Sequence, residues 1–374
     1  MDFGLSEEQI LLRDTARDLF ARSYDVEKRN EVIATELGWS RDVWGKLAEL
    51  GILGLPFTED DGGADAGPIE TMTVVTELGR RLAPEPLVDA VYVPGGIIAD
   101  AGTDEQRRRV LPAVAEGETL LAFAHQEPGT RWPTTDVSTK AERNGDSWTV
   151  SGRKHPVPHG DCADLLVVSA ATGDGLALFL VDATADGVSR TGFTTYDGSR
   201  GAQIEFAGAA AELLGDGADA AAAIVAADVR GQALLAAEAL GAMEESLRLT
   251  TEYLKTRKQF GVPLAKFQTL TQRAADMYVS LELARSMALY ANMSLADGAI
   301  DPVVASRTKL QIGRSGRHIG QEAIQLHGGI GVTAEYPVGH YLARLTSIEH
   351  ALGTTEDHLR VLAAAVSTYD QIEL

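Results

Sequence analysis

The sequence predicts an α+β multidomain protein, with an N-terminal helical domain at residues 1–118, a small antiparallel β-barrel or sandwich at 119–215 and a C-terminal helical bundle at 216–374. Apolar residues recur at helical spacing in the first and last thirds, whereas short apolar runs bounded by glycine and aspartate fill the middle. A chain of 374 residues is long enough for two or three packed cores.

Helical signals dominate the N-terminal third. Ser6, followed by Gln9 three residues later, is a capping-box signal for a helix start. Ala16 and Phe20 then lie at helical spacing. A second apolar face is formed by Trp44, Leu47, Leu50, Ile52 and Leu53. The Asp- and Gly-rich run Asp60–Gly67 predicts a flexible loop.

Strand signals fill the middle of the chain. Asn144-Gly145 stands between two strand-like segments, which is the signal of a hairpin turn. Further strand-like runs are Leu165–Val168, Leu176–Val181 and Gln203–Phe206. Several short strands in succession predict a small barrel or sandwich.

A long amphipathic helix opens the C-terminal part, beginning near Ala218. One face of this helix carries Leu240, Met243, Leu247 and Leu254. Further helices are predicted after Gln268 and after Asp301. Helices, then a small β domain, then a long bundle is an uncommon order along one chain.

Composition excludes several classes of partner. The 33 Lys and Arg against 54 Asp and Glu give a formal charge of −21, which disfavours nucleic acid and anionic membranes. A single cysteine, Cys162, excludes an internal disulfide and a cysteine-cluster metal site. The N-terminus shows no signal-peptide pattern, and we expect no apolar stretch of membrane-spanning length. A cytoplasmic protein is expected.

Two polar motifs in the C-terminal part suit a dinucleotide. The first is Arg257-Lys-Gln-Phe-Gly261 with Gln268 behind it, and the second is Gln325-Leu-His-Gly-Gly-Ile-Gly331. Arg offers a fixed fork of donors to a pyrophosphate, Gln a neutral donor and acceptor, and paired glycines allow close approach of the backbone. The alternative is an Arg on a solvated helix face and a Gly-Gly turn between helices.

Together these motifs resemble the acyl-CoA dehydrogenase family, and the resemblance covers essentially the whole chain. Further matching segments are Met1–Gln9, Leu50–Leu55, Gly79–Pro86 and Gly152–Lys154. The resemblance implies that the C-terminal domain is a four-helix bundle and that the reaction is FAD-dependent α,β-dehydrogenation of an acyl-CoA. It also implies an oligomer, with an electron-transfer flavoprotein as electron acceptor. The residues that would hold the ADP portion of a neighbouring subunit's FAD are Arg257, Phe260, Gln268, Gln325, Gly328 and Gly329.

The catalytic carboxylate that the family requires is missing from both of its usual positions. Counting from Glu335-Tyr-Pro-Val338 places Leu352 where most members carry the glutamate base, and counting back from Arg257 places Gly231 at the other position. Glu238 lies seven residues after Gly231, close to two helical turns, among apolar neighbours. Glu238 is therefore a displaced base, a structural carboxylate paired with an arginine such as Arg344, or an exposed surface residue.

The flavin-ring half of the family's β domain is altered as well, where a Thr and a Trp-Ile-Thr segment contact the ring. Gln126-Glu127-Pro128 replaces a Thr-Glu-Pro segment, and Arg131-Trp132-Pro133 stands where a Gly-Ser-Asp is usual. Pro156 and Pro158 replace the Trp and Thr of a Trp-Ile-Thr segment, and proline removes a backbone donor at each point. The chain thus keeps the half that grips a neighbour's FAD and has lost side chains that grip its own.

This asymmetry resembles the FadE-type subunits of actinobacterial acyl-CoA dehydrogenases that shorten steroid side chains and assemble as α2β2 heterotetramers. The resemblance implies that a sister subunit carries the base and the ring contacts. Two alternatives are a self-sufficient homotetramer using Glu238 and a non-catalytic binding or scaffold homologue. No metal site is expected, because the spacing of His155, His159 and His327 matches no ligand pattern and surface or capping roles suit them better.

Overall fold

The computed structural model describes residues 4–133, 136–145, 147–217, 220–364 and 366. The chain divides into two compact units, each built from separate stretches of sequence. The bundle unit takes Met1–Glu27, Met72–Leu82 and Gln232–Leu374 as far as they are described. The barrel unit takes Lys28–Thr71 and Ala83–Gly231, again as far as they are described. The predicted boundaries at residues 118 and 215 stay a prediction.

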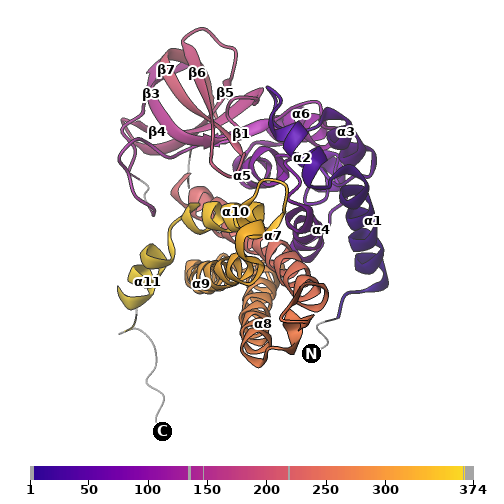
Figure 1. Ribbon diagram of the computed structural model, residues 1–374. Coiled ribbons are helices and arrows are strands. Elements are labelled where there is room, and N and C mark those ends of the chain that lie inside the picture. Colours follow the sequence, from indigo (N-terminus) through magenta and orange to yellow (C-terminus); the bar gives the residue numbers. More distant parts are fainter. Residues whose placement is uncertain (1–3, 134–135, 146, 218–219, 365, 367–374) are drawn as a thin grey trace. The chain divides into compact units, whose positions relative to one another are not determined.

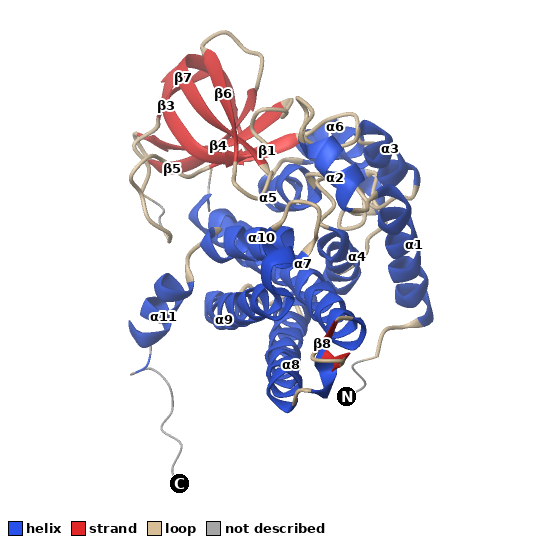
Figure 2. Cartoon of the chain, in the orientation of Figure 1, coloured by secondary structure: helices blue, strands red, loops and turns tan. Residues whose placement is uncertain are grey.

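The barrel unit combines short helices with a seven-stranded sheet (Figure 2). Its helical elements are α2 (Val26–Ile33), α3 (Arg41–Glu49), the 3-10 helix η1 (Glu59–Asp61), the π-helix η2 (Val88–Tyr92), α5 (Val93–Ala101) and α6 (Asp104–Ala115). Its strands are β1 (Leu121–Ala124), β2 (Lys140–Asn144), β3 (Ser147–Pro158), β4 (Leu165–Thr172), β5 (Gly175–Asp182), β6 (Val188–Thr194) and β7 (Arg200–Leu213).

The sheet closes on itself. The strands pair in the order β4-β2-β3-β7-β5, and β5 pairs back to β4, while β1 adds to β4 and β6 adds to β7. The interior is apolar and includes Val150, Leu166, Phe179 and Ile204, all fully buried. The predicted small β-barrel is confirmed. It is mostly antiparallel, but β1 and β2 each pair in parallel with β4.

Local signals in the sequence are reproduced. Asn144 pairs with Ser147 across the predicted hairpin turn, and Gly145 has a positive φ of 63°. Ser6 and Gln9 form a complete capping box at the start of α1 (Glu7–Ser23). The loop predicted at Asp60–Gly67 is more ordered than expected, because η1 occupies its start and buries the Asp61 side chain against Thr58.

The bundle unit holds α1, most of α4 (Pro68–Arg81) and the long C-terminal helices (Figure 1). These are most of α7 (Ala220–Thr256), then α8 (Gln268–Ala296), α9 (Pro302–His327), α10 (Val338–His350) and α11 (Thr355–Ala364). Between them lie β8 (Lys258–Gln259), β9 (Val262–Pro263) and the 3-10 helices η3 (Leu264–Lys266) and η4 (Gly328–Val332). The four apolar residues predicted to share a face of α7 are all buried in the unit's core.

Two glycines let α4 and α7 touch backbone to backbone. A Cβ on Gly241 would lie 1.9 Å from the carbonyl oxygen of Thr76, and one on Gly79 would lie 2.0 Å from that of Glu238. Both distances are far below any real carbon–oxygen contact, so only glycine permits this crossing.

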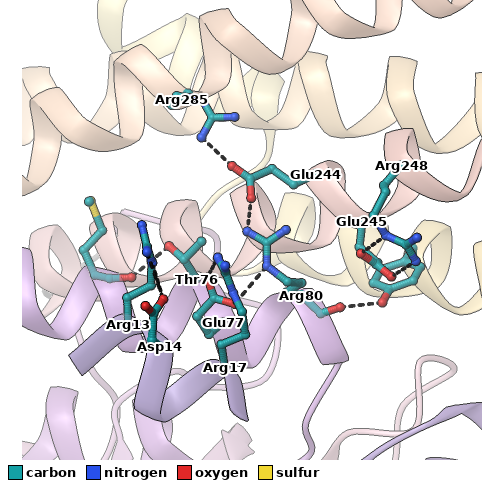
Figure 3. A network of polar contacts seen from close by, with 12 residues as sticks. Arg13, Asp14, Arg17, Thr76, Glu77, Arg80, Glu244, Glu245, Arg248 and Arg285 are labelled. Carbon is teal, nitrogen blue, oxygen red and sulfur yellow. Dashed lines mark hydrogen bonds and ion pairs between the residues drawn. The ribbon is translucent and has the colours of Figure 1, made fainter. Parts of the chain in front are cut away.

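An ion-pair network joins four helices of the bundle unit (Figure 3). Arg17 of α1 donates to Glu77 of α4 at 2.8 Å, and Arg80 donates to the same carboxylate at 2.9 Å. Arg80 and Arg285 of α8 both pair with Glu244 of α7. Because Glu77 and Glu244 are largely buried, each carboxylate needs these cationic partners.

Helix α7 also corrects one expectation from the sequence. Within the described residues it is the one helix long and apolar enough to cross a membrane by length and composition, although we expected none. However, 67% of its most apolar window is buried inside the protein, as is typical of a core helix. Its composition is therefore weak evidence for a membrane span.

Candidate functional site

The first motif forms the tip of the hairpin that connects α7 to α8. Lys258 pairs with Pro263 and Gln259 with Val262, which leaves Phe260 and Gly261 as a two-residue turn. Both turn residues have positive φ, 53° and 82°, as a type I′ turn requires. The Phe260 ring is 92% exposed, which is unusual for an aromatic side chain.

Polar groups around this turn face solvent. Arg257 and Gln268 are both exposed, and the Arg257 side chain has no hydrogen bond or ion pair to another described residue. Gln268 opens α8, whose N-cap residue Phe267 gives no side-chain cap. The uncapped N–H groups at this helix start favour an anion.

The second motif lies beside the first. The centroid of the His327 ring, at the end of α9, lies 4.5 Å from the centroid of the Tyr253 ring. Tyr253 belongs to α7 and precedes Arg257 by one helical turn. Its Nε2 atom lies 3.1 Å from the Tyr336 hydroxyl. His327 is buried, so it is not a surface residue, but its Nδ1 lies 2.7 Å from the Ala323 carbonyl in the last turn of α9, which agrees with the expected capping role. Burial lowers its pKa.

The glycines of the second motif are open. Gly328 adopts φ 67° and ψ −141°, a conformation that glycine alone adopts readily. A Cβ added to Gly328 or Gly329 would meet no atom within 4 Å, and Gln325 is exposed as well. We call this set of six residues the Arg257 end: Arg257, Phe260, Gln268, Gln325, Gly328 and Gly329.

Glu238 is held by Arg344 in the bundle unit. Arg344 donates from Nε to Oε1 at 2.5 Å and from Nη2 to Oε2 at 2.8 Å, so a two-pronged ion pair engages both carboxylate oxygens. Glu238 is only 3% exposed, so it is not a surface residue. The contact supports the structural role, and the assignment of Glu238 as a base stays a prediction.

Leu352 lies in a turn that neighbouring groups fix from several sides. Its φ is 52°, and its carbonyl oxygen lies 3.0 Å from Nε2 of the buried His358. The Leu352 side chain packs against the core of the bundle unit. Close to His358, the amine of the buried Lys309 donates a hydrogen bond to the carbonyl of Ile348 in the last turn of α10. Burial lowers the pKa of Lys309 to about 7. Burial and the nearby charge of Lys309 together lower the pKa of His358 to about 4.

A carboxylate that sequence reasoning missed lies three residues before Gly231. Asp228, on α7 within the barrel unit, accepts a hydrogen bond from Nε1 of Trp132 at 2.8 Å. Burial raises its pKa to about 6, and the bond from Trp132 opposes that shift. The sequence does mark this residue, since Asp228 is the one charged residue in the apolar stretch between Ala220 and Val229.

The segments Gln126–Glu127 and Lys154–Pro158, which we call the ring segments, lie side by side in the barrel unit. The N–H of His155 donates to the carbonyl of Gln126 at 2.8 Å. Lys154 is fully buried and donates to Glu127 at 2.8 Å, to the His125 carbonyl at 3.1 Å and to Ser169 at 3.1 Å.

Neighbouring groups of the protein satisfy the hydrogen-bonding capacity of the Lys154–Glu127 pair. Burial lowers the pKa of Lys154 to about 8, against the opposing pull of Glu127. Burial would raise the pKa of Glu127, but hydrogen bonds from Lys154, Ser138 and Thr139 outweigh it and hold the value at about 2. These charges therefore stabilise the fold and are not offered to a ligand.

Pro156 and Pro158 lie on the exposed positions of β3, on either side of buried Val157. The ladder with β7 is irregular between Lys154 and Val157, at the first of these prolines. Neither proline has an N–H to donate.

Comparison with known proteins decides the family. The chain matches the acyl-CoA dehydrogenase N-terminal domain over residues 6–118, the middle domain over 122–207 and the C-terminal domain over 222–367. This chain belongs to the acyl-CoA dehydrogenase family. Among its relatives is the probable acyl-CoA dehydrogenase YngJ of Bacillus subtilis (strain 168), 30% identical over 97% of this chain and 99% of that protein.

Solved acyl-CoA dehydrogenases share the whole fold. The steroid acyl-CoA dehydrogenase Tcur3481-Tcur3483 (G363A variant) is 33% identical, covers 97% of this chain and 98% of its own, and superposes with a TM-score of 0.90. The ChsE4-ChsE5 complex from Mycobacterium tuberculosis is 27% identical with a TM-score of 0.91, over 99% and 100% of the two chains. Butyryl-CoA dehydrogenase from Megasphaera elsdenii is 26% identical with a TM-score of 0.89, over 98% and 100%.

The predicted acyl-CoA dehydrogenase fold is thereby confirmed, and the chain is an oxidoreductase of this flavoprotein family. Its residues fit the family's cofactor unequally. The Arg257 end offers a guanidinium, amides and open glycines, which suit a pyrophosphate and an adenosine. The ring segments offer little to a flavin ring, because Pro156 and Pro158 have no N–H to donate and the charges of Lys154 and Glu127 pair with one another. Within the described part of the chain, no three His, Cys, Asp or Glu side chains gather as a metal site requires.

Proposed function

We propose that this chain is one subunit of a flavin-dependent acyl-CoA dehydrogenase and completes the FAD site of a catalytic sister subunit in an α2β2 assembly. The observation that carries the proposal is the contrast between the solvent-facing Arg257 end and the proline-substituted ring segments. A chain with only half of a cofactor site needs a second chain that supplies the other half.

The ADP portion of FAD would be held by the Arg257 end. Arg257 would pair with the pyrophosphate through a charge-assisted fork, and the open start of α8 would add N–H donors near Gln268. Gly328 and Gly329 would let the backbone approach the adenosine. When bound, FAD would supply the acceptor for the hydride that leaves the β-carbon of the acyl-CoA.

The proton acceptor would come from the sister subunit. Leu352 cannot accept a proton, Gly231 has no side chain, and both oxygens of Glu238 are already bonded to Arg344. The sister chain would therefore carry an intact Trp-Ile-Thr-like segment and a glutamate at one of the two family positions. Electrons would leave to an electron-transfer flavoprotein, in the cytoplasm.

A bulky, steroid-derived acyl-CoA is the substrate class that we propose. The support is the 33% identity to a protein described as a steroid acyl-CoA dehydrogenase, Tcur3481-Tcur3483. The similarity to the ChsE4-ChsE5 complex supports a two-chain assembly.

The test is the ratio of flavin to protein. The chain is purified alone and co-purified with a candidate sister chain that carries a Trp-Ile-Thr-like segment and a glutamate at one of the two family positions, and flavin absorbance is compared with protein mass. We expect no bound flavin in the chain alone and one FAD per pair of chains in the complex. One FAD per chain in a homotetramer that oxidises acyl-CoA would instead establish the self-sufficient form. No flavin in either preparation would establish a binding or scaffold role.

A further inference from the structure

The segment Glu127–Pro133, which we call the strap, is fastened at its start. Glu127 accepts hydrogen bonds from the N–H groups of Ser138 at 2.6 Å and Thr139 at 2.9 Å, in addition to the one from Lys154. Its carbonyl accepts from the N–H of Thr130 at 3.2 Å and from the hydroxyl of the same residue at 2.8 Å. The first turn of the strap is therefore closed and joined to strand β3.

The strap is fastened again near its end. Nε1 of Trp132 donates to Oδ2 of Asp228 on α7 at 2.8 Å, and both side chains are at least partly buried. A hydrogen bond to a partly buried carboxylate is stronger than one in water, because breaking it leaves a partly desolvated acceptor without its donor.

The helix that receives the strap is itself fixed within the barrel unit. Arg230, two residues after Asp228, forms a two-pronged ion pair with Asp100 of α5 at 2.5 and 3.0 Å. Ile224 and Ala227 on the same stretch of α7 are buried. Asp228 therefore lies on a stretch of α7 that ion pairing and apolar packing hold in place.

The strap leaves directly from the ring segments. Gln126, the residue before it, is bonded to His155 of β3, and Glu127 is bonded to Lys154. By the resemblance to the acyl-CoA dehydrogenase family, Gln126 stands at a position that would contact the flavin ring if the chain carried its own flavin. The strap that follows Gln126 commits its one indole donor to α7.

We propose that the strap closes this chain's own counterpart of the flavin-ring site, with the Trp132–Asp228 hydrogen bond as its fastening. This inference rests on the proposed function, since it explains why an assembly of two chains holds one flavin. The chain then contributes to a flavin site only through the Arg257 end.

The fastening is tested by hydrogen exchange of amides 129–132 and by trypsin cleavage after Arg131, an exposed residue inside the strap. Trp132→Phe removes the donor and Asp228→Leu removes the acceptor. Either variant of the full chain should speed exchange and cleavage about tenfold, as expected when one such bond is lost from a local opening equilibrium. Unchanged rates in both variants would overturn the fastening.

Two matched variants isolate the hydrogen bond. Asp228→Asn keeps an acceptor oxygen, and Trp148→Phe removes another partly buried indole of the barrel unit. Asp228→Asn should speed exchange and cleavage less than Asp228→Leu does, because the bond keeps an acceptor and loses only its charge, and Trp148→Phe should leave the rates of the strap near those of the wild type. Acceleration by Trp148→Phe equal to that by Trp132→Phe would show general loosening of the barrel unit and would also overturn the fastening.

Closure is tested in the complex with the sister chain, compared with and without FAD. Removing FAD should speed exchange at residues 257–268 and leave the strap unchanged, and Trp132→Phe should leave the flavin content unaltered. Strap amides that gain protection from FAD, or flavin lost from the Trp132→Phe complex, would make the strap a flavin contact and refute its closure. One FAD per chain in the wild type would instead refute the proposed function, whatever the strap does.

Discussion

The Arg257 end and the ring segments use polar groups in opposite ways. At the Arg257 end a guanidinium, two amide side chains and open glycine backbone face solvent, and the Phe260 ring beside them is 92% exposed. In the ring segments Lys154 and Glu127 are buried and bonded to each other. The comparison teaches that family motifs alone do not locate a working site. Groups that lack partners are available to a ligand, whereas groups that satisfy each other stabilise the fold.

The largest expected effect follows from removing the cationic fork of the Arg257 end. Arg257→Ala should weaken FAD binding to the two-chain complex by about 30- to 100-fold, since charge-assisted hydrogen bonds contribute about 1.5–3 kcal/mol. Flavin fluorescence titration of the apo-complex measures this. The control is Lys255→Ala, which removes one exposed charge from the last turn of α7, two residues before Arg257. An equal loss in both variants would reduce the role of Arg257 to general charge.

The next effect concerns Glu238, a buried carboxylate whose partner is known. Glu238→Ala should lower the free energy of unfolding by about 2 kcal/mol, because Arg344 is left with an unpaired charge that is mostly, but not fully, buried. The double variant with Arg344→Ala should lose less than the sum of the single losses. Denaturant unfolding of all four proteins measures the coupling, and additive losses would contradict a structural pair.

Kinetics separate that structural role from a catalytic one. Glu238→Gln in the complex should keep its flavin and retain turnover within about threefold, if the base belongs to the sister chain. A loss of about a thousandfold, with flavin still bound, would make Glu238 the base. Flavin bleaching by substrate in a single turnover measures the step directly.

The fold could be predicted further than the site. Periodicity gave the order of helices and strands, and local signals gave the Ser6 capping box and the Asn144-Gly145 turn, because each depends on residues close in sequence. Closure of the barrel through β4 and β5 and the α4–α7 crossing at Gly79 and Gly241 depend on residues far apart, which no local pattern records.

The same limit explains the site. Exposure of the Arg257 end could be anticipated from a turn motif. Whether a carboxylate is structural or available for chemistry depends on its tertiary partner. Arg344 lies 106 residues from Glu238, and Trp132 lies 96 residues from Asp228. The sequence offered Arg344 as one possible partner of Glu238 and gave no reason to single out Asp228.

A smaller effect is expected from pH, through Lys309. Its folded pKa is about 7, whereas the pKa of an unfolded lysine is about 10.4. Between these values the unfolded chain binds more protons, so stability should rise with pH from about 7 to 10. Lys309→Met should reduce this increase in the free energy of unfolding by about 1–3 kcal/mol, measured by denaturant unfolding at several pH values. The exposed Lys266 provides the control, since Lys266→Met should leave the slope unchanged.

The smallest effect is expected where the family's usual base would stand. Leu352→Glu restores a carboxylate in a turn that His358 holds in place, and because the Leu352 side chain is only partly buried, stability should change by about 1 kcal/mol or less. The isolated chain should still show no acyl-CoA oxidation, because Pro156 and Pro158 leave two exposed positions of its ring segments without an N–H donor. A dye-coupled dehydrogenase assay with saturating FAD measures this. Activity gained by Leu352→Glu alone would mean that the ring segments accept a flavin despite their prolines, and would remove the distinction between the two regions of the molecule.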